Sequence, residues 1–148
     1  MSQSLAKVYV HIVFTTKHGQ TTIKEEIRSE LHSYMIGVLS NLGSFTNEIY
    51  ANPDHVHILC SLPRTLTIAE LIAKTKTSSS KWIKQKGILG FGWQDGYGIF
   101  SVSASLLGTV KKYIINQPKH HFKKNYKDEF RLFFNEYGIE FDERYVWD

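Results

Sequence analysis

The stretch FTNEIYANPDHVHILCSL, residues 45–62, predicts the centre of the fold. Two runs of strand-forming residues, 45–51 and 55–62, flank an Asn-Pro-Asp sequence whose residue types all favour a turn. Side chains alternate along a strand, so His55 and His57 point to one face and the aliphatic side chains between them point to the other. We predict a hairpin whose apolar face packs on helices and whose histidines stand on the opposite, open face.

Outward from the hairpin, apolar periodicity predicts the neighbouring elements. In residues 7–16 every second side chain is apolar, which predicts a strand with one face on a core. In residues 23–42 apolar side chains recur at helical spacing, which predicts a helix. Thr67 fits an N-cap, and Glu70 three residues later completes a capping box for a second helix that runs on towards Ile83. The chain therefore begins as strand, helix, hairpin and helix.

The second half adds one strand and two helices. After a glycine-rich segment, we expect a short strand over 97–102, a helix over 105–117 and a last helix over 123–137. The order β-α-β-β-α-β predicts an α+β, ferredoxin-like (split β-α-β) antiparallel sheet, with helices on one face and a C-terminal helical extension. No repeat or linker interrupts it, so residues 1–148 are expected to form a single domain.

The charge of the chain is unevenly distributed. The formal net charge of +4 is the sum of three unlike stretches. Residues 1–63 have a net charge of −1, and residues 128–148 have a net charge of −5. Residues 64–127, with 12 Lys/Arg against 2 Asp/Glu, have a net charge of +10. A strongly basic stretch favours a polyanion, above all nucleic acid, because neutralising phosphates releases condensed counterions. The alternative is a solvated basic face balanced by the acidic tail.

The cysteine count and hydropathy exclude several classes of protein. Cys60 is the single cysteine, so neither a disulfide framework nor a multi-cysteine zinc site can form within the chain. The sequence shows no secretory signal and no window of 18 apolar residues. We therefore expect a cytoplasmic protein that does not span a membrane.

Two short motifs carry candidate chemistry. Two imidazoles at His55 and His57 on a rigid strand can share one metal ion, although such a pair is more often structural. Tyr113 and Gln117 lie four residues apart on one helical face, where a phenol and an amide oxygen can meet the same ligand. Taken singly they fit a boundary aromatic and a surface amide, and Pro118 leaves the direction of Gln117 open.

Together these motifs resemble the single-tyrosine HUH transposases, which move insertion sequences as single-stranded DNA. The strand with histidine, a hydrophobic residue and histidine is followed by a helix with Tyr-Ile-x-x-Gln, as in that family. The resemblance covers nearly the whole chain. It includes residues 10–17, 52–57, 93–103 and 113–117, together with His120 and His121.

The resemblance implies an activity and a site. It implies a transposase in which Tyr113 attacks a DNA phosphodiester, becomes joined to the 5′ phosphate and releases a 3′ hydroxyl, so that strands can later be rejoined. It assigns His55, His57 and Gln117 as ligands of a divalent metal, Mg²⁺ or Mn²⁺. It also implies single-stranded DNA with hairpin-forming ends as partner, and a homodimer in which the tyrosine helix of one subunit completes the histidine pair of the other.

Basic residues of the middle stretch are the candidates for DNA binding, and each has the alternative interpretation of a solvated charge. They are Arg64, Lys74, Lys76, Lys81, Lys84, Lys111, Lys112, Lys119, Lys123 and Lys124, with His120 and His121. Two other functions stay open. One is a non-catalytic nucleic-acid-binding module on the same sheet, and the other is a domesticated, repeat-associated tyrosine nuclease that no longer mobilises its own gene.

Overall fold

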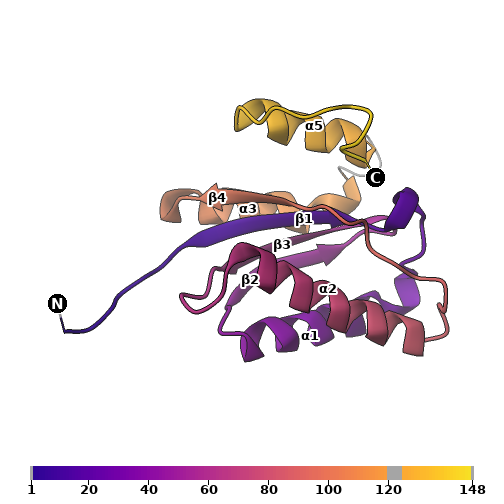
Figure 1. Ribbon diagram of the computed structural model, residues 1–148, viewed down its shortest axis with the longest axis horizontal. Coiled ribbons are helices and arrows are strands. Elements are labelled where there is room, and N and C mark those ends of the chain that lie inside the picture. The colour runs from indigo at the N-terminus through magenta and orange to yellow at the C-terminus, as the bar shows by residue number, and fades with distance from the viewer. Residues whose placement is uncertain (1, 120–124, 148) are drawn as a thin grey trace.

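The computed structural model describes residues 2–119 and 125–147 and has a four-stranded sheet at its centre (Figure 1). Its strands are β1 (Tyr9–Thr15), β2 (Thr46–Ala51), β3 (His55–Ser61) and β4 (Gly98–Val102). They are ordered β2-β3-β1-β4, and every neighbouring pair is antiparallel. This topology confirms the predicted α+β fold, and each strand lies within or one residue from the stretch expected for it.

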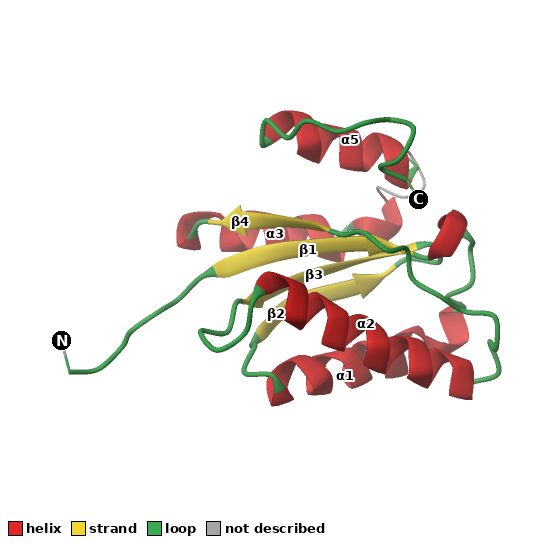
Figure 2. Ribbon diagram, in the orientation of Figure 1, coloured by secondary structure: helices red, strands yellow, loops and turns green. Residues whose placement is uncertain are grey.

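Two long helices cover one face of the sheet (Figure 2). They are α1 (Glu25–Asn41) and α2 (Ile68–Gln85). The capping box at the start of α2 is confirmed: the backbone N–H of Glu70 donates to Thr67 Oγ1 at 3.1 Å, and the Thr67 N–H donates to Glu70 Oε1 at 3.2 Å. Within the described residues, no helix is both long and apolar enough to cross a membrane.

Alternation along β1 and β3 divides the molecule into two packed layers. Val10, Ile12 and Phe14 of β1 face α1 and α2, where they join the main core with Val56 and Ile58 of β3. This core is completed from the helices by Leu31, Met35, Leu39, Leu71 and Ile83. Because successive side chains alternate, the residues between them, the histidines of both strands included, point to the second face.

The second face is covered, whereas we expected it to be open. Helix α3 (Leu107–Ile115) packs against β2 and β3, and α5 (Tyr126–Glu136) lies over β1 and β4 (Figure 1). Phe130 and Phe134 of α5 contact Val13 and Phe100 there. The predicted C-terminal extension carries an aromatic stripe of Phe130, Phe133, Phe134 and Tyr137, of which Phe130 and Phe134 are buried against the sheet. This packing removes apolar surface from water.

Helix termini account for the other differences from the predicted ranges. Helix α3 follows a short 3-10 turn (Ala104–Leu106) and ends at Ile115, and residues 117–119 are helical again after a turn at Asn116. Helix α5 begins after Asn125, whose side chain accepts a hydrogen bond from the Asp128 N–H at 2.9 Å. An N-cap of this type satisfies a free N–H of the first turn.

Candidate active site

The histidine pair lies on β3 in the middle of the second face. His55 pairs with Thr15 of β1, and His57 pairs with Val13 of β1 and Tyr50 of β2. Both imidazoles are fully buried, so the expectation that they stand on an open face is wrong. The reason is tertiary: α3 and α5 meet above them.

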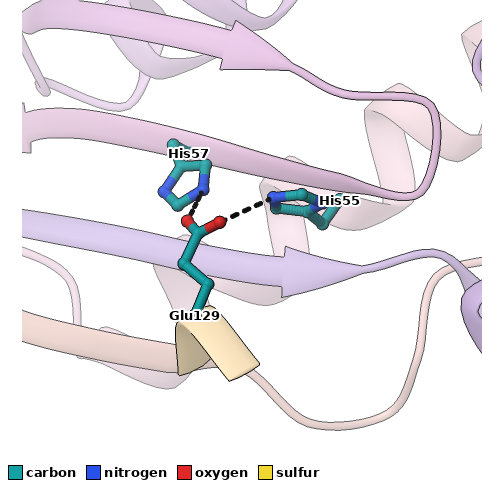
Figure 3. Close-up of side chains that lie close together, drawn as sticks. All are labelled: His55, His57 and Glu129. Atoms are coloured by element: carbon teal, nitrogen blue, oxygen red, sulfur yellow. Dashed lines mark ion pairs between the residues drawn. The ribbon is translucent and has the colours of Figure 1, made fainter. Parts of the chain in front are cut away.

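Glu129 of α5 extends its carboxylate between the two imidazoles (Figure 3). Its Oε1 atom lies 2.7 Å from His57 Nε2, and its Oε2 atom lies 3.8 Å from His55 Nε2. One ligand atom from each of the three residues falls within 4.8 Å of the others. Burial opposes ionisation of Glu129, but its hydrogen bond with His57 and the charges of both histidines outweigh burial and lower its pKa to about 2. The carboxylate is therefore ionised at neutral pH.

The far side of each imidazole is also bonded. His55 Nδ1 lies 2.6 Å from Asp54 Oδ1. His57 Nδ1 lies 2.8 Å from Nε2 of His11 on β1, and the two rings stack with centroids 5.1 Å apart. Each Nδ1 is thus occupied by a neighbour, and each Nε2 faces Glu129.

Tyr113 of α3 lies half-buried beside this cluster. Its ring centroid is 5.8 Å from that of His57, and its hydroxyl shares hydrogen bonds with Glu129 and Gln117. Burial raises the pKa of the phenol, the charge and hydrogen bond of Glu129 raise it further, and the hydrogen bond with Gln117 lowers it only in part. The phenol is therefore protonated at neutral pH in this environment.

Gln117 is fully buried next to the same cluster, despite the proline that follows it. Its Oε1 accepts from Asn52 Nδ2 at 2.9 Å, and its Nε2 donates to Glu129 Oε1 at 3.3 Å. The structure thus brings all four expected residues together. The amide oxygen is engaged by Asn52 here, and the role of Gln117 as a metal ligand stays a prediction.

The sequence interpretation missed Glu129 and His11. Glu129 interrupts the aromatic stripe of the last helix, next to Phe130 and four residues before Phe133, and a carboxylate at an apolar helical position is a usable signal. It was counted only as part of the acidic tail. His11 alternates with the core residues of its strand, so it shares the face on which the histidine pair was expected.

The candidate DNA-binding residues fall on different sides of the molecule. Lys111 and Lys112 are exposed and adjacent in sequence to Tyr113. Lys81 and Lys84 lie on α2, on the face of the sheet opposite the histidine pair. Together with Tyr97, which precedes β4, they line an open groove of about 680 Å³.

The other candidates are placed as follows. Arg64, Lys74 and Lys119 are exposed, whereas Lys76 donates to the carbonyl oxygens of Gln94 and Gly96 at 2.8 and 2.6 Å. Burial lowers the pKa of Lys76 to about 8. We interpret Lys76 as a residue that ties a loop to α2. His120, His121, Lys123 and Lys124 lie outside the described residues.

Sequence comparison relates the chain to one family. Residues 4–117 match the family model described as IS200-like transposase. A curated relative, the ISDra2 transposase TnpA of Deinococcus radiodurans, is 24% identical over 114 residues, which cover 72% of this chain and 81% of the relative. The range matched by the family model spans the histidine pair, Tyr113 and Gln117, and it ends before Glu129.

Two solved structures share the fold. A crystal structure assigned as a transposase from D. radiodurans R1 superposes with a TM-score of 0.60 at 21% identity, covering 77% of this chain and 93% of that one. The structure of a REP-associated tyrosine transposase bound to a REP hairpin gives a TM-score of 0.56 at 17% identity, covering 81% and 74%. At these identities the likeness concerns the fold.

Proposed function

Because the chain belongs to the family of IS200-like transposases, we propose that it cleaves and rejoins single-stranded DNA through a covalent bond to Tyr113. The observation that supports this best is the convergence of four groups from three elements: the phenol of Tyr113, the imidazoles of His55 and His57, and the carboxylate of Glu129. A purely structural core has no need of so many titratable groups in contact.

In the proposed reaction, the phenolic oxygen forms a bond to the scissile phosphorus as the bond from phosphorus to the 3′ oxygen breaks. The tyrosine loses its proton, and the departing oxygen gains one and becomes the 3′ hydroxyl. The 5′-phosphotyrosine keeps the energy of the broken bond, and attack by a 3′ hydroxyl reverses the step. Lys111 and Lys112, exposed beside Tyr113, supply positive charge near the phosphate.

The donor set fits a divalent cation such as Mg²⁺ or Mn²⁺. His55 and His57 would hold it, and the carboxylate of Glu129 adds a hard oxygen ligand, which these ions prefer. Gln117 is the second candidate for the third ligand, as the resemblance implies. When bound, such an ion polarises a phosphoryl oxygen and offsets the negative charge that raises the pKa of Tyr113.

Access to the site requires movement of α5. His55 and His57 are 0% exposed and Glu129 only 3%, so a phosphate cannot reach them in the described arrangement. We propose that DNA binding shifts α5 enough to admit a phosphate while Glu129 keeps facing His55 and His57.

The DNA is proposed to be single-stranded with hairpin-forming ends, which the hairpin-bound structural neighbour supports. Arg64, Lys74, Lys81, Lys84 and Lys119 are proposed phosphate contacts. A second function, a repeat-associated nuclease, draws support from the same neighbour, and its catalytic residues would be identical. Hairpin-forming sequences beside the gene distinguish the two.

The homodimer stays a prediction. One chain already places Tyr113 beside His57, so we propose that the site can act within one subunit. Mixing Tyr113→Phe protein with His57→Ala protein tests this arrangement. Activity that reappears in the mixture means that the tyrosine of one subunit serves the histidines of another.

The test of the proposed function is an adduct assay with oligonucleotides from the gene's own flanks. With Mn²⁺, the protein should become covalently joined to the 5′ phosphate of the downstream fragment and migrate more slowly on a denaturing gel. Tyr113→Phe must abolish the adduct, whereas the exposed control Tyr145→Phe must not. An adduct that survives Tyr113→Phe would refute the role of Tyr113. Salt-sensitive binding without any adduct would favour the non-catalytic module.

A further inference from the structure

Each imidazole of the candidate metal site has a buried partner on its Nδ1 atom, and neither partner comes from the helix that carries Tyr113. Asp54 directly precedes β3, and His11 lies on β1, two residue pairs along the ladder from His57. Both partners are almost completely buried, at 8% and 4% exposed. We propose that Asp54 and His11 are positioning residues, which orient His55 and His57 so that both Nε2 atoms face one cation.

Asp54 defines the tautomer of His55. A carboxylate can only accept a hydrogen bond, so at 2.6 Å the Nδ1–H of His55 donates to Asp54 Oδ1. When the ring is neutral, as a metal ligand must be, its Nε2 atom then carries a lone pair. An independent contact agrees, because the Asn52 amide nitrogen, a donor, lies 3.0 Å from that Nε2.

The carboxylate of Asp54 is itself held in place through its backbone. The backbone carbonyl oxygen of Asp54 accepts hydrogen bonds from the Thr16 N–H at 2.9 Å and from the Thr16 hydroxyl at 3.2 Å. These bonds tie the turn before β3 to the end of β1. The position of Asp54 is therefore supported by the sheet, while Phe130 of α5 packs edge-on against the His55 ring with centroids 5.7 Å apart.

His11 plays the matching part for His57. The cross-strand register brings the two rings onto the same face, where they stack and share the 2.8 Å contact. An imidazole offers a donor or an acceptor at Nε2, so His11 can satisfy His57 Nδ1 both when His57 Nε2 donates to Glu129 and when His57 Nε2 binds an ion. An apolar residue at position 11 would leave His57 Nδ1 buried without this partner.

The inference rests on the metal site of the proposed function, and binding of Mn²⁺ alone tests it without DNA. Outer partners of this kind typically contribute 10–100-fold in metal affinity. We expect Asp54→Ala and His11→Leu to weaken Mn²⁺ binding by about 10–100-fold, measured from the free Mn²⁺ signal in electron paramagnetic resonance. Asp54→Asn and His11→Gln, which keep a neutral acceptor, should lose less and carry the test if the larger changes unfold the protein.

A matched control separates positioning from general destabilisation. His32 is a partly buried histidine outside the site, which accepts from the Ala51 N–H at 2.9 Å, and His32→Leu should leave Mn²⁺ affinity unchanged. Nitrogen-15 spectra of EDTA-treated protein should show His55 as the Nδ1–H tautomer, and Asp54→Asn should weaken that preference.

The outcomes are distinct. Wild-type affinity in the Asp54 and His11 variants would overturn this inference and leave the metal site intact. Wild-type protein that binds no Mn²⁺ would overturn the metal site together with the inference, whereas the tyrosine adduct is judged separately by the Tyr113→Phe comparison.

Discussion

Replacing Glu129 by glutamine removes one negative charge from a buried centre in which two imidazoles and a phenol depend on it. The amide keeps an oxygen that can accept from His57 Nε2, which lies 2.7 Å away in the native site, so the change is mainly electrostatic. The native pKa of about 2, against an ordinary value of 4.5, corresponds to about 3 kcal/mol of stability.

The sign of the pH dependence follows from the lowered pKa of Glu129. A carboxyl group with a lower pKa in the folded state stabilises the fold above its unfolded pKa, and this stabilisation is lost as pH falls through the folded pKa. The unfolding free energy of wild type should exceed that of Glu129→Gln by about 3 kcal/mol at pH 7 and by about 1 kcal/mol at pH 3. The neighbouring histidines are present in both proteins.

Urea unfolding in EDTA, followed by tryptophan fluorescence between pH 3 and pH 7, measures this difference. Glu136→Gln makes the same chemical change at an exposed position of α5 and should follow the wild-type curve. A constant gap between wild type and Glu129→Gln over this pH range would refute the electrostatic argument, because it would mean that the carboxylate has no special partner in the folded state.

Three further changes test the helix cap, the loop tie and the nucleophile. Thr67→Ala should lower the unfolding free energy by about 1 kcal/mol in urea titrations and leave adduct formation by folded protein unchanged. Lys76→Met should lower the unfolding free energy by about 1–3 kcal/mol because it leaves the carbonyl oxygens of the loop without their donor. The control Lys81→Met should change the unfolding free energy by less than about 0.5 kcal/mol. Because the pKa of Tyr113 is raised, the single-turnover rate of adduct formation should increase with pH from 6 to 8 by up to about tenfold per pH unit, and a flat profile would contradict rate-limiting loss of the phenolic proton.

The sheet could be predicted because its signals are local. Alternation in residues 7–16 and 55–62, and the turn between the hairpin strands, specify the strands and the hairpin without knowledge of distant parts of the chain. The capping box at Thr67 likewise depends on a few consecutive residues. Helix boundaries near Asn116 and Asn125 were less accurate because short turns and caps decide them.

The cover on the second face could not be predicted in the same way. Its formation depends on how the aromatic residues of α5 pack on β1 and β4, far away in sequence. For the same reason, the sequence pointed to His55 and His57 but not to Glu129 between them. The roles of Tyr113 and Gln117 came from family resemblance, since a tyrosine and a glutamine four residues apart are common on any helix.

The position of Glu129 also bears on how relatives are compared. The family match ends at residue 117, so the segment that places a carboxylate between the histidines is outside the part by which membership is recognised. Two relatives can therefore agree at the tyrosine, the histidines and the glutamine and still differ in the charge at the centre. A chimaera that joins residues 4–117 of this chain to another member's tail would reveal whether metal preference and reaction rate travel with the shared domain or with the tail.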